Sequence, residues 1–436
     1  MTSAAGEAKE AAAGSGSSVE EAVVAIARAA RVASRRLARS TPSERTSALE
    51  AIADALDAHA DAIVEANALD LEAADASGIA GAMRNRLELD AAGVAKLSTA
   101  VREVAAQPDP LGAIEDEQVR PNGLRVGRMR IPLGVVAMIY ESRPNVTSDA
   151  AVLCLKAGNA VVLRGGSEAL HSNRAIAGAI RAGLERSSLP ADAVQLIPMS
   201  DRSAIDVLLV QEESIDLVIP RGGEGLIRAV TRKSRIPVLQ HYKGVCHVFV
   251  DESAPLERAV DIVHNAKVQR PGVCNAAETL LVHEGAAERV LPAIARRLTE
   301  SGVELRGCER TREVLVGVAV TPATEDDWHA EYLDLTLAVR VVPDLEAALD
   351  HIATYASSHT EAIVTDDPQA AATFVSAIQS STVLVNASTR FADGGELGLG
   401  AEIGISTSRL HAYGPMGANE LTTRKFVVFG DGQIRG

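Results

Sequence analysis

From residue 132 onward, two kinds of apolar pattern alternate along the chain. Short runs of consecutive apolar residues, such as 134–139 and 160–163, are typical of strands buried on both faces. Longer segments between them repeat their apolar residues every three or four positions, as helices do. This alternation predicts parallel sheets covered by helices on both faces, which bind ligands at the carboxyl ends of their strands.

The alternating pattern falls into two groups, so we expect two doubly wound α/β domains without internal repeats. In the first group the expected strands are 134–139, 160–164, 193–198 and 215–219, and the expected helices are 147–156, 168–184, 203–211 and 223–232. In the second group the expected strands are 245–250, 278–282, 337–342, 361–364 and 382–385, and the expected helices are 254–267, 286–298, 344–357 and 368–378.

The chain before residue 107 is helical in pattern. Residues 19–75 predict two helices, and the second begins with Thr41 as cap, Pro42 at the first helical position and Glu44 closing a capping box. A further helix is expected at 90–106. The first 18 residues are mostly Ala, Gly, Ser and Glu and do not resemble a secretory signal, so we expect a mobile tail on a cytoplasmic protein.

Two segments have the pattern of β-ribbons. Residues 118–131 alternate apolar with basic residues around Asn122-Gly123, a hairpin signal, and residues 424–434 are strand-like before a Gly-Asp-Gly turn. Isolated ribbons are unstable, so each needs a sheet or a partner chain. They predict either an ordinary edge hairpin or an arm for oligomerisation.

Charge and composition exclude several classes of function. The 43 Lys and Arg against 58 Asp and Glu leave a formal net charge of −15, which disfavours binding to nucleic acid or anionic lipid. No apolar run reaches the roughly 20 residues of a membrane helix. The four cysteines are far apart, without C-x-x-C or H-E-x-x-H, so we expect no metal site and regard His351 and His359 as structural.

Two glycine-rich turns follow expected strands, at 164–167 (RGGS) and 221–225 (RGGEG). Glycine lets backbone N–H groups approach a phosphate at a helix start, and each turn adds an arginine. Neither is G-x-G-x-x-G, and a tight turn is the alternative reading. Arg164 and Ser167 are compatible with a 2′-phosphate, whereas an acid there would favour a bare ribose.

Cys274 is the strongest candidate nucleophile, because Gly272 allows a sharp turn, Arg270 can lower the pKa of the thiol, and Asn275 offers donors to an oxyanion. Cys154 and Cys246 have the pattern of core residues, and Cys308 lies in a charged stretch. A polar loop that begins at Asn386 runs into a glycine-rich stretch, 394–404. It either caps the domain or holds a polar substrate.

These motifs resemble the aldehyde dehydrogenase superfamily and, within it, the family of gamma-glutamyl phosphate reductases (glutamate-5-semialdehyde dehydrogenases). The resemblance covers residues 20–436. Its most specific blocks are 139–147 (IYESRPNVT), 268–276 (VQRPGVCNA), 386–408, and His351, Ile352, Ser357, His359, Thr360, Glu361 and Ile363.

The resemblance implies NADPH-dependent reduction of L-glutamate 5-phosphate to L-glutamate 5-semialdehyde with release of phosphate, the second step of proline biosynthesis from glutamate. It implies a homo-oligomer, with a glutamate 5-kinase as a further candidate partner. By similarity Cys274 forms a thioester and Asn275 stabilises the oxyanion. The implied substrate contacts are Glu141, Ser142, Arg143, Asn145, Arg270, Asn386, Ser388, Thr389 and Arg390. The implied cofactor contacts are Arg164, Gly165, Ser167, Arg221, Gly222, Gly223 and, for the nicotinamide ribose, Glu331.

The resemblance also implies the fold, aldehyde dehydrogenase-like with a cofactor domain, a catalytic domain and a ribbon arm for oligomerisation. The expected NADP-binding domain is 19–117, 132–248 and 406–423, the catalytic domain 249–405, the ribbon arm 118–131 and 424–436, and the tail 1–18. Two positions depart from the family: Tyr413 replaces an arginine, and Ala356 replaces glycine or serine. If that arginine binds substrate or the cofactor phosphate in the family, Tyr413 cannot make the contact, and Arg143, Arg270 and Arg390 are the residues that can compensate.

Two alternatives stay open. One is a general aldehyde dehydrogenase that oxidises and hydrolyses. Such enzymes have a water-activating glutamate in a Leu-Glu-Leu-Gly-Gly motif, where this chain has Gln240, which is not a base; the neighbouring His241 can substitute. The other is a catalytically silent binding subunit, against which the intact loop from Arg270 to Asn275 argues.

Overall fold

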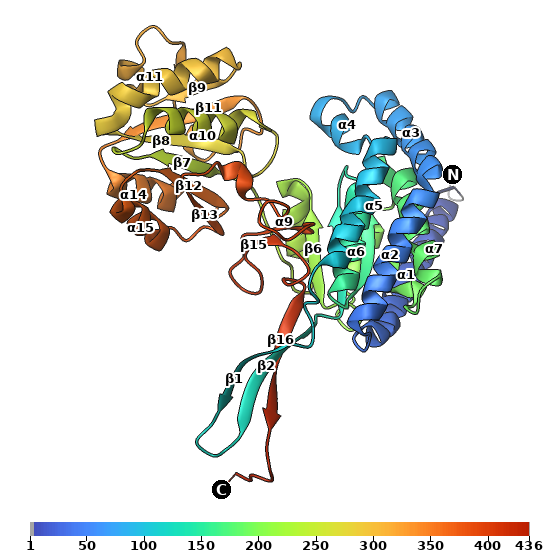
Figure 1. Ribbon diagram of the computed structural model, residues 1–436. Helices are drawn as coiled ribbons and strands as arrows, with labels where there is room; N and C mark the ends of the chain where they lie inside the picture. Colours follow the sequence, from blue (N-terminus) through green and yellow to red (C-terminus); the bar gives the residue numbers. More distant parts are fainter. Residues whose placement is uncertain (1–3, 436) are drawn as a thin grey trace. The chain divides into compact units, whose positions relative to one another are not determined.

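The computed structural model describes residues 4–435, with side chains for residues 18–81 and 83–435. It divides the chain into two compact units (Figure 1). Unit 1 contains the described residues up to Gln240, Leu399–Gly404, and those from Met416 on, and unit 2 contains His241–Gly398 and Ile405–Pro415. The chain passes from unit 1 to unit 2 between Gln240 and His241, before strand β7 (Cys246–Val250). The domain boundary expected at residue 248 would cut that strand.

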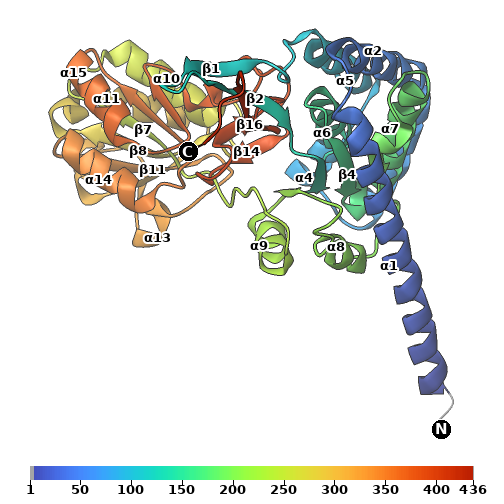
Figure 2. The same ribbon diagram turned by 90° about the horizontal axis from the view of Figure 1, so that it is seen from below.

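Helices precede the first sheet. They are α1 (Ala4–Leu37), α2 (Pro42–Ala58), α3 (Ala60–Ala76), α4 (Gly81–Leu87) and α5 (Ala91–Ala106). The capping box of Thr41 and Glu44 is present. The stretch 19–75 holds three helices, because the backbone breaks at His59, between α2 and α3. The long helix α1 begins inside the expected tail 1–18 (Figure 2); residues 1–3 of that tail lie outside the described residues.

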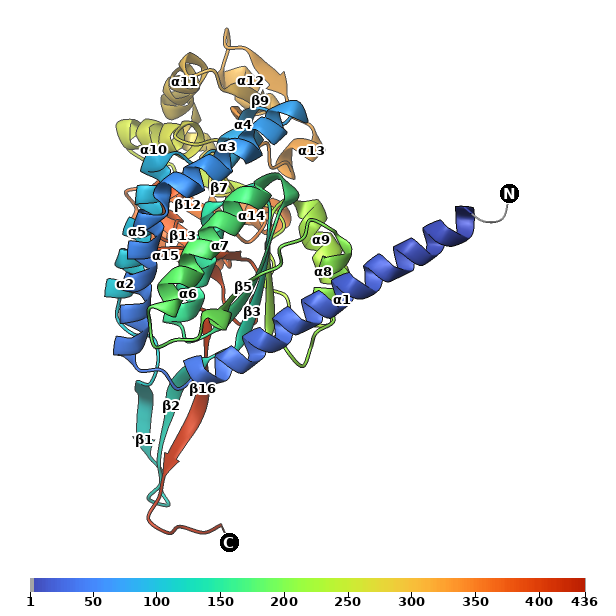
Figure 3. The ribbon, with the colours of Figure 1, turned by 90° about the vertical axis from the view of Figure 1, so that its right-hand side faces the viewer.

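Unit 1 contains a parallel sheet in the order β5-β4-β3-β6. Its strands are β3 (Val135–Tyr140), β4 (Ala160–Gly165), β5 (Val194–Leu196) and β6 (Leu217–Arg221). The associated helices are α6 (Asn145–Lys156), η1 (Ser167–Ala169), α7 (Leu170–Glu185), η2 (Ala191–Ala193), α8 (Ser203–Leu208) and α9 (Glu224–Lys233). Figure 3 shows α6 and α7 on one face and α1, α8 and α9 on the other, so both faces are buried.

Unit 2 contains a parallel sheet in the order β10-β9-β11-β8-β7-β12-β13. Besides β7, its strands are β8 (Ala277–His283), β9 (Glu304–Gly307), β10 (Val320–Pro322), β11 (Thr336–Val342), β12 (Thr360–Val364) and β13 (Thr382–Val385). Its helices are α10 (Leu256–Val268), α11 (Glu284–Glu300), α12 (Glu309–Val314), α13 (Glu325–Trp328), α14 (Leu345–Tyr355), α15 (Pro368–Ala377) and η3 (Thr389–Phe391). Helices α10 and α11 cover one face and α14 and α15 the other (Figure 1). The expected α/β fold class is therefore confirmed.

The two predicted ribbons are strands of one antiparallel sheet, β1-β2-β16, formed by β1 (Ile114–Val119), β2 (Arg125–Pro132) and β16 (Thr422–Phe429). Arg424 of β16 pairs with Arg130 of β2. The short strands β14 (Gly404–Ser406) and β15 (Gly414–Met416) form a further pair. Within residues 4–435, no helix combines the length and apolar character needed to cross a bilayer.

Candidate active site

Cys274 lies in the loop between α10 and β8, three residues before the strand begins, and its side chain is half-buried. In a parallel sheet this position is at the amino ends of the strands. The sequence analysis expected ligands at the carboxyl ends, so in unit 2 the nucleophile lies at the other edge. Cys154 and Cys246 are buried, and burial raises the pKa of both thiols, which makes them poor nucleophiles.

Close backbone contact holds Cys274 in place. A Cβ atom on Gly244 would lie 1.9 Å from the carbonyl oxygen of Cys274, so only glycine allows this approach. The Gly244 N–H donates to Glu331 Oε1 at 2.7 Å, and Cys246 Sγ lies 3.2 Å from the same Cys274 carbonyl. The segment from Gly244 to Cys246, which leads into β7, therefore packs against the backbone of the nucleophile loop.

Asn275 and Arg390 form a polar pair beside the nucleophile. Asn275 is buried, its Nδ2 donates to Ala392 O at 3.0 Å, and its Oδ1 accepts from Arg390. Arg390 also donates to Gln269 Oε1 at 2.8 Å. Burial lowers the pKa of the Arg390 guanidinium, and Arg270 and Cys274 are close enough for their charges to act on it. Three predicted residues, Cys274, Asn275 and Arg390, are thus brought together.

Two histidines approach Cys274 from other segments. Donor atoms of His241, Cys274 and His359 all lie within 4.8 Å of one another. The two imidazole rings are 4.9 Å apart between centroids, and Thr360 Oγ1 lies 2.7 Å from His359 Nδ1. His359 is therefore a neighbour of the nucleophile, although the pattern along the chain had suggested a purely structural role.

A buried ion pair joins the two elements that flank the nucleophile loop, α10 and β8. Lys267 Nζ lies 2.6 Å from Glu278 Oε2, and both side chains are inaccessible to solvent. Burial raises the pKa of Glu278 and lowers that of Lys267, because neither charge is hydrated. Glu278 also accepts from the Leu333 N–H at 3.3 Å. The pair thereby anchors the segment that contains Glu331.

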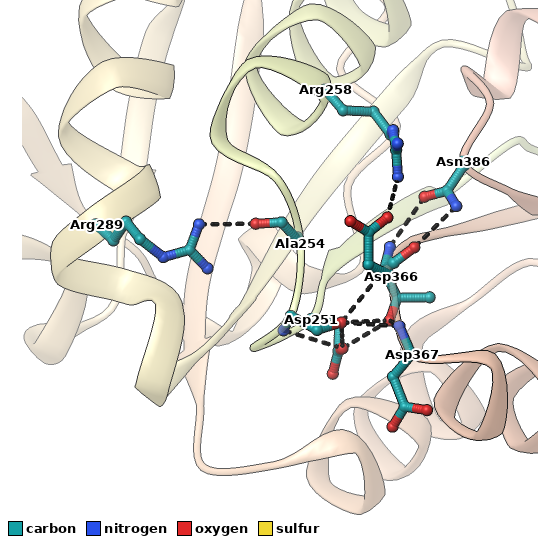
Figure 4. A network of polar contacts seen from close by, with 9 residues as sticks. Asp251, Ala254, Arg258, Arg289, Asp366, Asp367 and Asn386 are labelled. Carbon is teal, nitrogen blue, oxygen red and sulfur yellow. Dashed lines mark hydrogen bonds and ion pairs between the residues drawn. The ribbon is translucent and has the colours of Figure 1, made fainter.

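Asn386 is not brought to Cys274. It follows β13 at a φ of 56°, donates to Thr365 O at 2.8 Å and accepts from Thr365 N at 3.0 Å. Figure 4 shows it beside Asp251 and Asp366, which follow β7 and β12, so this network lies at the carboxyl ends of the strands. Of the residues after it, Ser388 and Thr389 are buried. Further along the segment, the Arg390 side chain and the Ala392 carbonyl both contact Asn275 of the nucleophile loop.

In unit 1 a hydrogen bond joins the turn after β6 to the turn after β3. Glu141 Oε2 accepts from the Gly223 N–H at 2.9 Å, and a Cβ on Gly222 would meet that same oxygen at 2.2 Å. Ser142, at a φ of 48°, donates through its backbone N–H and hydroxyl to Glu168 Oε1, at 2.6 and 2.8 Å. These predicted residues therefore meet at the carboxyl ends of β3, β4 and β6.

A cavity of about 540 Å³ opens at this edge of the unit 1 sheet. Arg164, Arg202 and Lys233 bring positive charge to its lining, which also contains Ser167 and the carboxylates of Glu141, Glu168 and Asp206. Lys233 Nζ is paired with Asp206 at 2.7 Å, so the two arginines carry the positive charge that faces a ligand. Arg164 is buried and donates to Gly165 O and Ser200 O at 2.6 and 2.9 Å. The carboxylate of Glu168 is engaged by Ser142. The lining can therefore hold an anionic ligand despite the acidity of the whole chain.

Two further residues with predicted roles in unit 1, Asn145 and Arg221, lie near acidic groups. Asn145 donates to Asp149 Oδ2 at 2.8 Å, and Arg221 lies 3.4 Å from Glu402 Oε1. Arg143, predicted with them, is half-buried in the turn before α6. Burial raises the pKa of Asp149 to about 6, while Asn145 and Arg221 oppose that rise.

The two departures from the family have structural partners. The Tyr413 hydroxyl donates to the carbonyls of Ser358 and Gln379, and the Arg409 guanidinium lies 5.6 Å from the Tyr413 ring centroid. Ala356 ends α14 in extended conformation, and the next residue, Ser357, accepts from the Val245 N–H at 2.8 Å. Tyr413 and Ser357, the neighbour of Ala356, thus hydrogen-bond to the segments that lead into β7, β12 and β13.

The sequence analysis missed Gly244, Arg202 and Lys233. Gly244 is one glycine among many, and its role depends on a contact with a loop 30 residues away, so no local signal existed. Arg202 follows β5, at the carboxyl edge where the strand rule places ligands, so that rule identified the location but not the residue.

Comparison with known proteins identifies the family. The family model described as "Aldehyde dehydrogenase family" matches residues 6–333. The gamma-glutamyl phosphate reductase of Desulfatibacillum aliphaticivorans is 58% identical over 418 residues, which are 96% of this chain and 100% of that protein. The enzyme of that name from Nitratidesulfovibrio vulgaris is 57% identical over 410 residues, 94% of this chain and 98% of that protein.

The crystal structure of gamma-glutamyl phosphate reductase from Thermotoga maritima matches with a TM-score of 0.92 and 47% identity. The match covers 95% of this chain and 100% of that one. The chain belongs to the aldehyde dehydrogenase family and, within it, to the gamma-glutamyl phosphate reductases.

Proposed function

We propose that the enzyme reduces L-glutamate 5-phosphate to L-glutamate 5-semialdehyde and phosphate, with NADPH as hydride donor, as a step of proline biosynthesis. Relatives up to 58% identical over nearly the whole chain bear the name of this reductase. The observation that carries the proposal is the half-buried Cys274 thiol, backed by Gly244 and flanked by Asn275 and Arg390.

The chemistry begins at the sulfur. The Cys274 thiolate attacks the acyl carbon, a C–S bond forms, and the C–O bond to the phosphate group breaks, which releases phosphate and leaves a thioester. Arg270 and Arg390 supply positive charge next to this loop, which suits an anionic leaving group. The second N–H of the Asn275 amide is the proposed donor to the developing oxyanion.

Unit 1 is the proposed dinucleotide-binding unit. When bound, the dinucleotide supplies the hydride that reduces the thioester carbon. The residues proposed to hold it are Arg164, Gly165, Ser167, Arg221, Gly222, Gly223 and, from unit 2, Glu331. The fit rests on the arginines of the cavity lining, Arg164 and Arg202, beside Ser167. Glycine at 165 is required by packing, because a Cβ there would meet Asn173 Nδ2 at 2.1 Å.

Gln240 supports a reductive outcome over hydrolysis. Its Oε1 accepts from the Thr231 hydroxyl at 2.9 Å, and an amide cannot take a proton from water at neutral pH. A thioester without a water-activating carboxylate survives long enough to be reduced.

The test follows the reverse reaction, NADPH formation from pyrroline-5-carboxylate with and without phosphate. Phosphate-dependent formation is the expected result; phosphate-independent formation would establish a hydrolytic aldehyde dehydrogenase, and no formation a silent subunit. Cys274→Ser should lose nearly all turnover while dinucleotide binding, measured by calorimetry, persists. The matched control is Cys308→Ser, because Cys308 caps α12 and has no proposed role. Wild-type turnover in Cys274→Ser would refute the nucleophile.

A further inference from the structure

The reduction proposed above uses only the sulfur of the Cys274 cluster. Two imidazoles, those of His241 and His359, lie with Cys274 so that the three donor atoms are within 4.8 Å of one another. The three residues come from separate segments: the entry of the chain into unit 2, the nucleophile loop, and the residue before β12. This is a set of metal-ligating groups for which the reaction gives no reason.

The protein orients the ring of His359 and leaves one nitrogen of His241 without a partner. His359 is buried, and its Nδ1 lies 2.7 Å from Thr360 Oγ1 and 3.7 Å from Cys246 Sγ. Metal-binding histidines have this arrangement, in which a hydrogen bond at one ring nitrogen orients the other toward the ion. His241 Nδ1 is buried without a hydrogen-bond partner among the described residues, a costly state for a polar atom.

We infer that His241, Cys274 and His359 form a site for one thiophilic divalent cation, of which Zn²⁺ is the best fit, with a fourth position open. One thiolate and two imidazoles are the donors that zinc prefers, and with zinc–ligand bonds of about 2.0–2.3 Å the tetrahedral ligand atoms lie roughly 3.3–3.8 Å apart. The three donors lie within 4.8 Å of one another and must move closer to reach that spacing when the ion binds. The carboxylates that Mg²⁺ or Ca²⁺ would need are not in the cluster.

The cation replaces the thiol proton, which passes to solvent, and a metal–sulfur bond forms. Zinc and the acyl phosphate then compete for the same sulfur. Zinc binding therefore inhibits reversibly and shields the thiol from alkylating reagents. The metal site itself rests on geometry alone, whereas this inhibition also rests on the proposed function.

Cobalt spectroscopy tests the site without reference to turnover. The full-length protein is titrated with Co²⁺, and one equivalent should produce a thiolate-to-cobalt charge-transfer band and intense tetrahedral d–d bands, which Zn²⁺ then bleaches. Cys274→Ser should lose the charge-transfer band, and His241→Asn and His359→Asn should each weaken binding about tenfold or more. Cys308→Ser and His264→Asn, outside the cluster, should bind as the wild type does.

Thermal melting confirms that each variant is folded before titration. No charge-transfer band in the wild type, or equal affinity in the wild type and both histidine variants, would overturn the site. In the reverse assay, micromolar Zn²⁺ should inhibit, EDTA should restore turnover, and His241→Asn should be less sensitive. A cobalt band without zinc inhibition would uphold the metal site and count against Cys274 as nucleophile. Turnover that depends on Cys274, without a cobalt band, would uphold the nucleophile and overturn the metal site.

Discussion

At the scale of single residues, the position of Cys274 depends on the missing side chain of Gly244. Gly244→Ala would place a Cβ 1.9 Å from the Cys274 carbonyl oxygen, so the nucleophile loop must move. A displacement of about 1 Å at a reacting group costs on the order of 100-fold in rate, which is the expected loss in kcat. Kinetics should show this loss while calorimetry shows unchanged dinucleotide binding.

The matched control is Gly178→Ala in α7, because a Cβ there meets nothing within 4 Å and alanine favours a helix. That variant should keep wild-type kcat and stability. A Gly244→Ala enzyme with wild-type kcat would show that the loop is positioned by other contacts.

The raised pKa of the Asp149 carboxyl leads us to expect that the stability of the fold depends on pH. Burial raises the pKa of its carboxyl to about 6, above the value near 4 of an unfolded aspartate, so the folded state favours the protonated form. This contribution is present below about pH 4 and is lost as the pH rises through 6, a change of roughly 3 kcal/mol. Asp149→Asn, which cannot ionise, should match the wild type near pH 4 and exceed it in stability near pH 7.

Melting temperatures of both proteins at pH 4, 5, 6 and 7 measure the effect. If the difference between Asp149→Asn and the wild type were constant across this range, Asp149 would not titrate as its burial implies.

At the scale of elements, the loops after β4 and β5 bring positive charge to one cavity. Arg202 is exposed and lies close enough to Arg164 for its charge to lower the pKa of that guanidinium. A like-charge pair of this kind suits a phosphate group. Arg202→Ala should raise KM for NADPH about tenfold and that for NADH less than about twofold, since one charge-assisted hydrogen bond contributes about 1.5–3 kcal/mol.

Steady-state kinetics with both cofactors check this prediction. Arg310→Ala is the control, because Arg310 pairs with surface carboxylates of unit 2 and changes the net charge equally. An equal rise in KM for both cofactors would show that Arg202 contacts a part that NADPH and NADH share, and not the 2′-phosphate.

At the scale of the whole molecule, the β1-β2-β16 sheet is too small to be a folding unit of its own and has large apolar side chains in solvent. Phe426, Val428 and Phe429 are 65%, 53% and 43% exposed. Exposed apolar strands invite pairing or packing with another chain. We expect a homo-oligomer, and Phe426→Asp with Val428→Asp should shift it toward the monomer.

Sedimentation of the wild type and the double variant measures this shift. Val316→Asp is the control, because Val316 is 87% exposed and is not part of the ribbon sheet. A double variant with the mass of the wild-type assembly would exclude this face as the interface.

Local patterns in the sequence were sufficient for most elements and for the nucleophile. The apolar run at 134–139 became β3, the Thr41–Glu44 box began α2, and the Cys274 loop lies between a helix and a strand as expected. Short elements were the exception: α4, β9, β10, β14, β15, α12 and α13 have too few residues for a clear periodicity, so they were not predicted.

Only the tertiary structure determined which distant residues are in contact. The sequence by itself determined helix and strand positions, because their apolar periodicities are properties of neighbouring residues. It could not join β2 to β16, separate Asn386 from Cys274, or bring His241 and His359 to the sulfur. These arrangements depend on pairing between strands far apart in the chain and on which sheet edge each loop occupies, and no periodicity within a segment encodes either.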